Sequence, residues 1–195
     1  MKIQYPTGAT PLDTDELEAL LLPLKTQEEL NKAEKQAIFE CRIAIQKSRK
    51  LKSKILTVSA LKELHNKMLS PVWEWAGRFR TTEKNIGVSP HQIQIKLHEL
   101  CENCSYRLAG VDERSWPEFA AHFHHTLVYI HPFPNGNGRL ARLATDVLSW
   151  KLKLKEPTWG RGDLGSNIPE RIFYIDALKS ADKGELKQLI DFMFS

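Results

Sequence analysis

The sequence predicts an all-α protein that carries one small β-hairpin. Apolar residues recur three or four positions apart over most of the chain, which is the spacing of one helix face. Capping residues begin these stretches, and glycine or proline ends them. Only residues 71–95 interrupt the pattern, with short strand-like alternation at 79–82 and 93–95 around a polar turn. We therefore expect helices throughout, with a hairpin in that one interval.

The N-terminal part is expected to form an arm and a helical extension. Residues 1–12 are punctuated by proline and glycine, which favours an extended conformation. A capping residue at Asp13 and the proline at Pro23 bound a short helix. Apolar spacing then predicts a long helix over 26–48. We assign residues 1–54 to this part.

The second part, residues 55–195, is expected to hold the main helical domain. Its helices follow the same spacing rule, and a glycine-rich connection over 157–165 separates the last two from the others. The predicted helical stretches are 57–69, 93–108, 115–127, 140–151, 169–178 and 186–193.

Composition excludes several classes of protein. With 42% hydrophobic and 27% charged residues, the 195-residue chain is typical of globular proteins rather than disordered ones. No apolar run approaches the roughly 18 residues of a membrane span. Three cysteines form no disulfide framework, so we expect a reduced, cytoplasmic protein. The net charge of +4 permits an anionic ligand, but the basic run 42–54 lacks interleaved aromatic residues and does not favour nucleic acid.

Segment 131–142, HPFPNGNGRLAR, combines features of an anion-binding site. Gly136 and Gly138 flank Asn137 where a helix begins, and glycine allows successive backbone N–H groups to point into one concavity. A helix N-terminus adds unpaired N–H groups and the positive end of its dipole. Together these features predict a cradle for phosphate groups.

Side chains around this cradle suggest chemistry on phosphorus. Arg139 and Arg142 lie three residues apart, on neighbouring positions of one helix surface, and guanidinium groups bind phosphate oxygens well. His131 precedes the cradle and is able to accept a proton near neutral pH. A base beside a polyphosphate site indicates activation of a hydroxyl for attack on phosphorus.

Two alternatives concern the same segment. Gly136-x-Gly138-x-x-Ala141 also fits a dinucleotide fingerprint, with residues 126–130 as its strand and Glu156 as its acidic residue. However, no further β-α alternation follows. The glycines would also suit a simple turn between two helices, although that reading leaves the histidine and both arginines unexplained.

A third alternative is a zinc site. Cys101-x-x-Cys104 could supply two ligands, but both cysteines fall within a predicted helix, whereas a structural site places them on a tight turn. The nearby histidines that could complete it are His122, His124 and His125.

The segment resembles the core motif of the Fic (filamentation induced by cAMP)/Doc family, His-x-Phe-x-(Asp/Glu)-Gly-Asn-Gly-Arg-x-x-Arg, and matches seven of its eight specified positions. Residues 73–80 resemble the family's Trp-Ala-Gly-x-x-Arg segment, and 174–184 resemble its C-terminal helices, so the similarity covers 55–194. Residues 8–13 and 29–34 further resemble the subgroup called mobile mystery protein B.

The resemblance implies a protein adenylyltransferase that moves AMP from ATP to a Ser, Thr or Tyr hydroxyl. His131 would be the base, and the Gly136–Gly138 backbone with Asn137 would hold the α- and β-phosphates. Arg139 and Arg142 would bind the outer phosphates, since such transfer depends mainly on positioning and charge neutralisation.

The resemblance also implies supporting roles and partners. Phe133 would anchor the loop in the core. Tyr174 would line the base pocket, although a core aromatic with a satisfied hydroxyl is an equal alternative. Residues 82–93 would form a flap that aligns a segment of the target protein by strand addition. An antitoxin or other regulatory partner is a further expectation.

One position departs from the family motif. The family's Mg²⁺ ligand is Asp or Glu, and here it is Asn135, whose amide oxygen brings no charge. The alternative function is therefore a weakly active or inactive nucleotide-binding module of a regulatory or toxin–antitoxin system. Gly138 stands where the kinase-like branch has lysine, which favours nucleotide transfer over γ-phosphate transfer.

Many family members are autoinhibited by a helix reading (Ser/Thr)-x-x-x-Glu-(Gly/Asn), and that full pattern is absent here. By its place in the chain, Glu34 is the inhibitory candidate, with Arg142 as its expected partner. A solvent-facing Glu34 is the alternative interpretation, and Glu170 is the C-terminal candidate.

Overall fold

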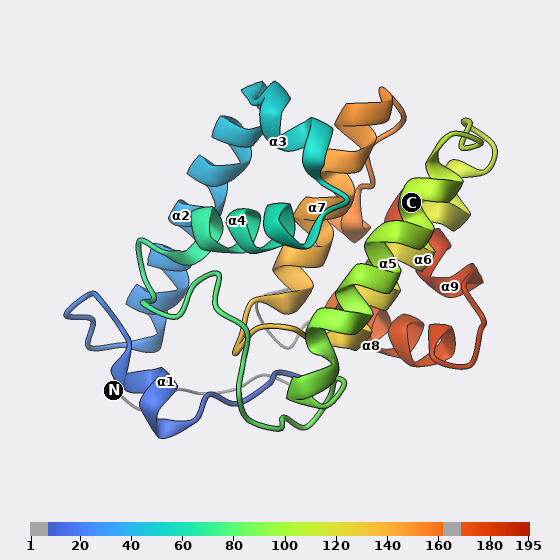
Figure 1. The fold of residues 1–195 in the computed structure, drawn as a ribbon. Helices are drawn as coiled ribbons and strands as arrows, with labels where there is room; N and C mark the ends of the chain where they lie inside the picture. The colour runs from blue at the N-terminus through green and yellow to red at the C-terminus, as the bar shows by residue number, and fades with distance from the viewer. Residues whose placement is uncertain (1–7, 162–168) are drawn as a thin grey trace.

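A computed structural model describes residues 8–161 and 169–195. Within these ranges the chain forms nine α-helices, two short 3-10 helices and no β-strand, so the predicted all-α class is confirmed (Figure 1). No helix in the described ranges has the length and apolarity to cross a bilayer. The elements are α1 (Thr14–Glu18), α2 (Gln27–Lys47), α3 (Arg49–Lys54), α4 (Val58–Leu69), η1 (Pro90–Gln92), α5 (Ile93–Leu108), α6 (Trp116–Ile130), α7 (Asn137–Leu152), η2 (Trp159–Arg161), α8 (Pro169–Ala181) and α9 (Lys187–Phe194).

Helix α7 lies at the centre of the fold. It packs against α2, α3 and α4 on one side and against α6 on another (Figure 1). Ten of its sixteen residues are buried, because neighbours cover more than one of its faces. Four of these are polar, and two of the four, Thr145 and Ser149, hydrogen-bond to carbonyls of their own helix. The N-terminus of α7 is consequently set among several elements.

Residues between 8 and 54 pack into the same core. Helix α2 contacts α4 and α7, and it buries four apolar side chains there. Its N-terminus is fixed by a capping box between Thr26 and Glu29. The division into 1–54 and 55–195 stays a prediction, since α2 shares the hydrophobic core of the later helices. The four buried apolar residues are Leu30, Ala37, Cys41 and Ile45.

The predicted hairpin is wrong. Residues 79–89 form a loop, and residues 93–95 begin α5 instead of a strand. Backbone N–H groups of the loop bond to other segments and not to each other. The Arg80 N–H donates to the Pro132 carbonyl at 3.0 Å, and the Val88 N–H donates to the Ile130 carbonyl at 3.4 Å. Its backbone is thus paired with the end of α6 and the loop after it, and no strand ladder forms.

A polar cluster fastens α2 to α7. Asp146 is buried on α7 and accepts from Arg42 of α2 and from the Trp159 indole N–H, the latter at 2.9 Å. Arg42 also donates to Glu156 at 2.7 Å and lies over the ring of Trp150. Burial raises the pKa of Asp146 to about 6, although Arg42 opposes that shift.

Arg42→Ala is expected to destabilise the fold by about 2 kcal/mol, because it leaves a buried carboxylate without its main partner. Urea denaturation at pH 7 measures this change. Lys32→Ala is the matched control, since Lys32 is an exposed cation on the same helix and should change the free energy of unfolding by less than about 0.5 kcal/mol. Equal effects of both variants would contradict the role given to the cluster.

Candidate active site

The motif forms the connection between α6 and α7. Helix α6 ends at Ile130, and the next residue, His131, adopts a left-handed conformation with φ of 52°. Gly136 also has positive φ, 78°, directly before α7 begins at Asn137. The positive φ favours glycine there, and a Cβ atom on Gly136 would lie 2.7 Å from Leu69 Cδ1 and require that side chain to shift. The turn thus presents the N-terminus of α7 beside His131.

Asn137 holds this loop through its side chain. Its Oδ1 accepts from the Phe133 N–H at 2.9 Å, and its Nδ2 donates to the Phe133 carbonyl at 2.8 Å. Its oxygen and one of its N–H donors thus bind the loop backbone, and the expected contact of Asn137 with phosphate stays a prediction. Asn137 also presents its backbone N–H at the start of α7. Phe133 is fully buried, in agreement with its expected anchoring role.

His65 supports the loop from α4, and sequence reasoning missed it. Its ring stacks on Phe133 with centroids 3.8 Å apart. Its Nδ1 accepts from the Gly77 N–H at 2.9 Å, so the proton is on Nε2, which donates to the Asn135 carbonyl at 3.0 Å. Burial lowers the pKa of His65 to about 3. The sequence could have indicated His65, because this histidine falls on the apolar face of the helix predicted over 57–69.

Arg80 ties the loop at 79–89 to the motif. Its buried guanidinium donates to the carbonyls of His131 at 2.7 Å, Thr82 at 2.8 Å and Val88. Gly87 of the same loop packs so closely that a Cβ atom there would lie 2.6 Å from His131 Cβ. The residues expected to form a flap therefore lie against the histidine, as a loop rather than a hairpin.

His131 is sealed from solvent in this structure. Its side chain Nε2 lies 3.0 Å from the hydroxyl of Thr10, which comes from the N-terminal arm. Burial lowers the pKa of His131 to about 4, and the positive charges of Arg80 and Lys84 contribute. The Val128 backbone offsets part of this shift, although its contact with Nδ1 falls short of hydrogen-bond geometry. The ring is neutral at pH 7 and is thus able to accept a proton.

Asn135 does not form a metal site with its neighbours. Its Oδ1 accepts from the Gly136 N–H at 2.6 Å and from Arg139 at 3.2 Å, and its Nδ2 donates to the Thr10 carbonyl at 3.3 Å. No group of three His, Cys, Asp or Glu side chains gathers anywhere in the described ranges. A single neutral oxygen that already faces two donors does not fit a resident Mg²⁺ ion.

The zinc alternative has no support, because Cys101 and Cys104 are buried within helix α5 and not on a tight turn. Burial raises the pKa of the Cys101 thiol to about 12 and that of Cys104 to about 11, which disfavours the thiolate that zinc requires. His124, one of its proposed ligands, instead accepts or donates a hydrogen bond at the Tyr174 hydroxyl, at 3.0 Å.

Glu34 contacts a motif arginine, but not the expected one. Its carboxylate binds Arg139 at 2.6 Å and accepts from the Trp73 indole N–H at 2.7 Å. The predicted pairing with Arg142 is wrong, because Glu34 on α2 faces the first arginine of the motif. The solvent-facing alternative is also wrong, since Glu34 is only 9% exposed.

Arg142 and Tyr174 lie together near Gly138 at the α7 N-terminus. Arg142 stacks over the Tyr174 ring, whose hydroxyl bonds to His124, so Tyr174 is a core aromatic with a satisfied hydroxyl. Arg171 of α8 adds a third positive charge near Arg139 and Arg142, and its pKa is lowered by burial and by those charges. Gly138 lies here with room for a Cβ atom, so packing does not require glycine. An anion is able to approach its backbone closely.

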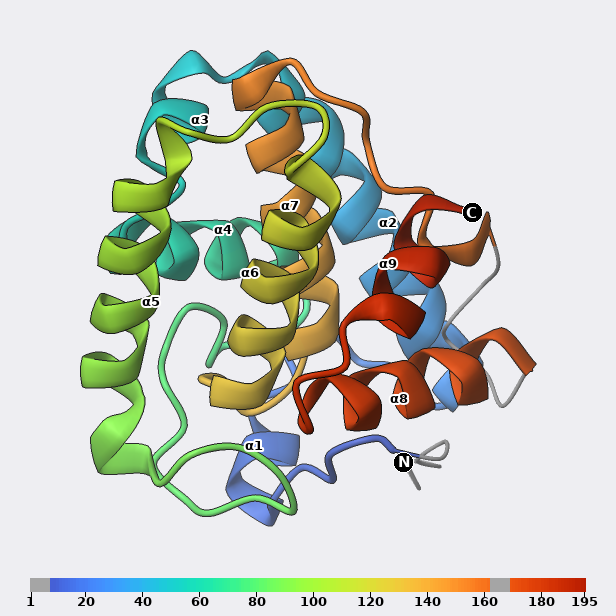
Figure 2. The ribbon, with the colours of Figure 1, turned by 90° about the vertical axis from the view of Figure 1, so that its right-hand side faces the viewer.

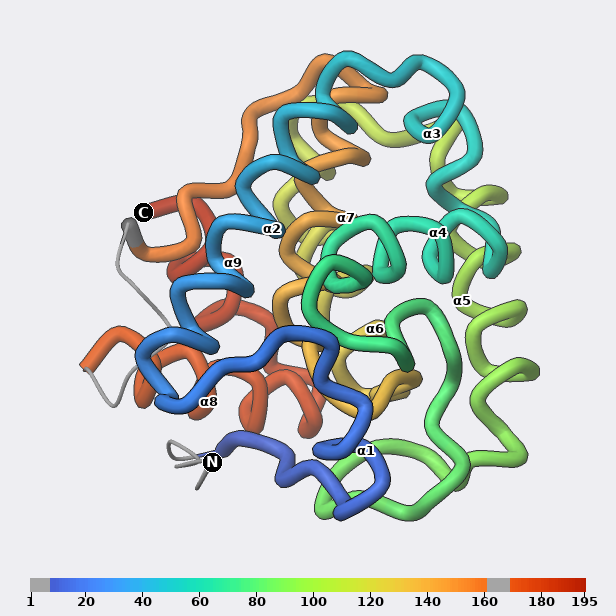
Figure 3. Tube along the Cα trace, turned by 90° about the vertical axis from the view of Figure 1, so that its left-hand side faces the viewer, coloured from blue at the N-terminus to red at the C-terminus, as the bar shows by residue number. Residues whose placement is uncertain are grey.

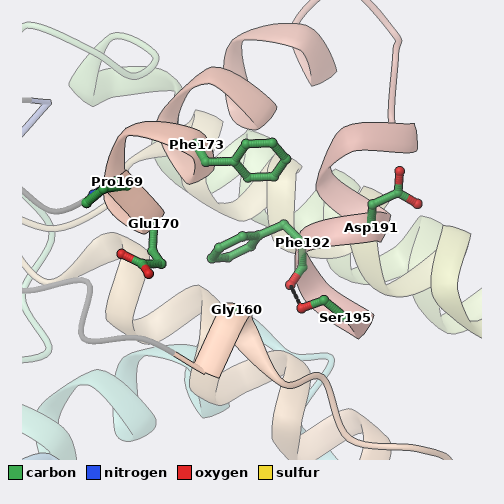
Figure 4. A pocket seen from close by; sticks show the side chains of 7 residues that line it. All are labelled: Gly160, Pro169, Glu170, Phe173, Asp191, Phe192 and Ser195. Atoms are coloured by element: carbon green, nitrogen blue, oxygen red, sulfur yellow. Dashed lines mark hydrogen bonds between the residues drawn. The ribbon is translucent and has the colours of Figure 1, made fainter.

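The described part also contains a hollow of about 380 Å³ away from the motif. It lies between η2, α8 and α9, where Phe173 and Phe192 line it (Figure 4). Glu170, the C-terminal inhibitory candidate, lines the same hollow. Of the two inhibitory candidates, Glu34 is therefore the one that contacts a motif arginine. Part of the predicted connection, residues 162–165, lies outside the described residues.

Comparisons with known proteins find relatives of this chain in one family. The sequence model of the Fic/DOC family matches residues 55–149. The chain is 28% identical over 148 residues to "Protein adenylyltransferase Fic" of Nematostella vectensis, covering 73% of this chain and 32% of that protein. It is also 28% identical over 133 residues to "Protein adenylyltransferase VbhT" of Bartonella schoenbuchensis, covering 57% and 28%. The chain therefore spans about a third of the length of these relatives.

Solved structures share the fold. The BepC protein of Bartonella tribocorum with bound AMPPNP superimposes with a TM-score of 0.73 at 17% identity, over 96% of this chain and 92% of that one. A Fic domain of Bartonella quintana with bound ADP gives a TM-score of 0.72 at 18% identity, over 89% and 87%. The arrangement of helices around the motif is thus that of these domains.

The free energy of unfolding is expected to fall as pH drops below about 6.5. Burial lowers the pKa of His65 and His124 to about 3 and that of His131 to about 4, so the unfolded chain binds these protons first. Each histidine contributes a slope of up to about 1.4 kcal/mol per pH unit. Asp146 opposes this trend, because its raised pKa favours the folded state below about pH 6.

Urea denaturation between pH 5 and 7.5 measures this slope. Three histidines outnumber one aspartate, so the net effect of acid is destabilising. His98→Gln is the control, because His98 is exposed and should leave the slope unchanged. A flat profile over this range would contradict the burial of neutral histidines.

Proposed function

The chain belongs to the Fic/DOC family through residues 55–149, and we propose that it is an adenylyltransferase that moves AMP from ATP to a Ser, Thr or Tyr hydroxyl of a protein. One observation carries the proposal: a histidine placed to bind a hydroxyl lies at the same helix terminus as a glycine turn and several arginines. The relatives named protein adenylyltransferases and the nucleotide-bound structures of the same fold support it.

The site would bind the polyphosphate at the N-terminus of α7. Backbone N–H groups of Asn137 and Gly138 would face phosphate oxygens, since the Gly136 N–H already donates to Asn135, and the helix dipole favours negative charge there. Arg139, Arg142 and Arg171 would neutralise the charge. These groups would position the phosphates and stabilise their negative charge. Transfer of a phosphoryl-type group depends mainly on these two effects.

His131 would accept the proton of the attacking hydroxyl at Nε2. That hydroxyl oxygen would form a bond to the α-phosphorus, and the bond to the β-phosphate would break with release of pyrophosphate. The low pKa of the free histidine would rise when the anionic nucleotide binds beside it, because an opposite charge favours the imidazolium. Since the residues do not form a resident Mg²⁺ site, no step is assigned to that ion, and the Mg²⁺ requirement stays a prediction.

Labelled ATP tests the proposed reaction. Incubation of the full chain with candidate proteins should transfer label from the α-phosphate and none from the γ-phosphate. His131→Ala should reduce that transfer by at least about 100-fold, because general bases contribute on that order, while nucleotide affinity stays nearly intact. His98→Ala, at an exposed histidine outside the site, is the matched control.

Two outcomes would contradict the proposal. Label that comes only from the γ-phosphate would indicate a kinase. Nucleotide binding without any labelling, also in the Glu34 variants below, would favour the alternative of a nucleotide-binding regulatory module. Full activity of His131→Ala would exclude this histidine as the base.

We further propose that Glu34 inhibits the reaction in cis. Its carboxylate forms an ion pair with Arg139 at 2.6 Å and accepts a hydrogen bond from the Trp73 indole N–H. A phosphate group must therefore compete with this carboxylate for the arginine. It also places negative charge near the cradle. Nucleotide would then bind in a pose that is misaligned for attack, at a large cost in rate.

Removal of this charge is expected to raise labelling. Because Glu34 is buried, Glu34→Gln is preferable to Glu34→Gly: its amide oxygen still accepts from Trp73, and the helix keeps a side chain. Labelling should increase roughly tenfold, since a charge-assisted hydrogen bond contributes about 1.5–3 kcal/mol. Glu28→Gln, at an exposed position of the same helix, should change nothing. Unchanged labelling in Glu34→Gln, with an intact fold by thermal unfolding, would remove Glu34 as an inhibitor.

A further inference from the structure

Thr10 places a hydroxyl where an acceptor hydroxyl has to lie. Its Oγ1 is 3.0 Å from Nε2 of His131, within the range expected between a general base and the group that it deprotonates. Thr10 and His131 are each 6% exposed, so the pair is closed off from solvent. The histidine is thus already matched with a threonine of its own chain.

Separate elements hold the arm in this place. The Thr10 carbonyl accepts from Asn135 Nδ2 at 3.3 Å, and the Ala9 carbonyl accepts from Asn85 Nδ2 at 3.4 Å. Gly8 packs against Ile175 of α8, where a Cβ atom would lie 2.6 Å from Ile175 Cδ1. Figures 2 and 3 show the arm passing from α8 to α1 along the loop that precedes α5. Contacts on both sides therefore fix the direction of the Thr10 side chain.

Charged contacts fasten the chain just after Thr10. Lys84 binds Asp13 at 2.8 Å and Glu16 at 2.6 Å, and its side chain is 3% exposed. Thr82 also donates to Asp13 at 2.6 Å. The arm thus lies along the loop that the family resemblance assigns to target binding.

We propose that Thr10 is an acceptor of the chain's own adenylyl transfer, in cis; this inference rests on the proposed function. The Thr10 Oγ1–H bond breaks and its proton passes to Nε2 of His131. Oγ1 forms a bond to the α-phosphorus of ATP, the bond from that phosphorus to the bridging oxygen of the β-phosphate breaks, and pyrophosphate leaves. The products are a Thr10–AMP phosphodiester and protonated His131, which returns its proton to solvent.

An acceptor inside the same chain has two consequences. The reaction is intramolecular, so its rate constant does not depend on protein concentration, and prior orientation of the hydroxyl favours it over external targets. Each chain also reacts once at this site, because an adenylylated Thr10 no longer has a hydroxyl to offer. Self-labelling at Thr10 therefore saturates at one AMP per chain.

Mass spectrometry of the full chain after incubation with ATP tests the proposal. We expect an adenylyl group on Thr10, formed with the same rate constant over roughly a hundredfold range of protein concentration. Thr10→Val, which keeps the shape and removes the hydroxyl, should lower self-labelling by at least about tenfold. Thr10→Ser should retain it. Thr14→Val is the matched control, since Thr14 is an exposed threonine four residues further on, and it should label like the unmodified sequence.

The outcomes separate this inference from the proposed function. Labelling that needs His131 but maps to another residue, and persists in Thr10→Val, would overturn the cis acceptor and leave the transferase intact. A rate proportional to protein concentration would also overturn it, because the acceptor would then react between chains. No labelling of any protein, even in the Glu34→Gln background, would overturn both. The thermal unfolding midpoint of Thr10→Val shows whether its loss of label reflects a loss of fold.

Discussion

The guanidinium of Arg80 holds together the two loops from which the site is built. It donates to His131 on the motif loop and to Thr82 and Val88 on the loop that precedes α5. These carbonyls lie in irregular backbone, where no helix supplies their partners, and unpaired buried carbonyls are costly. A single buried cation satisfies them together. The left-handed conformation of His131 and the position of the neighbouring loop both depend on this arrangement.

The motif and the helices on either side of it could be predicted because they depend on local signals. Apolar spacing identified α6 and α7, and the pair of glycines marked the turn between them. The contacts that complete the site are long-range, and no local pattern encodes them. Thr10 meets His131 across 121 positions of sequence, and Glu34 meets Arg139 across 105. Sequence reasoning selected Glu34 correctly as a contact of the motif but could not determine which arginine it faces.

The wrong hairpin and the contacts of Asn137 have one physical cause. Alternation at residues 79–82 and 93–95 predicts the hairpin, and the place of Asn137 in the motif predicts its contact with phosphate. In both cases a nearby backbone segment supplies the actual partner: the end of α6 and residue 132 for the loop, and Phe133 for Asn137. Backbone groups of irregular segments require partners as strongly as those of helices, and side chains that appear catalytic in a sequence often provide them.

The contact between Glu34 and Trp73 gives the site an optical reporter of its own. The indole N–H of Trp73 donates to the same carboxylate that binds Arg139, and its ring stacks on Trp75 with centroids 5.0 Å apart. A displacement of the carboxylate that also breaks its bond to the indole N–H would change the polarity around this indole. Trp73, one of five tryptophans in the chain, is thus placed to report on the contact between Glu34 and Arg139 at the α7 N-terminus without an added dye.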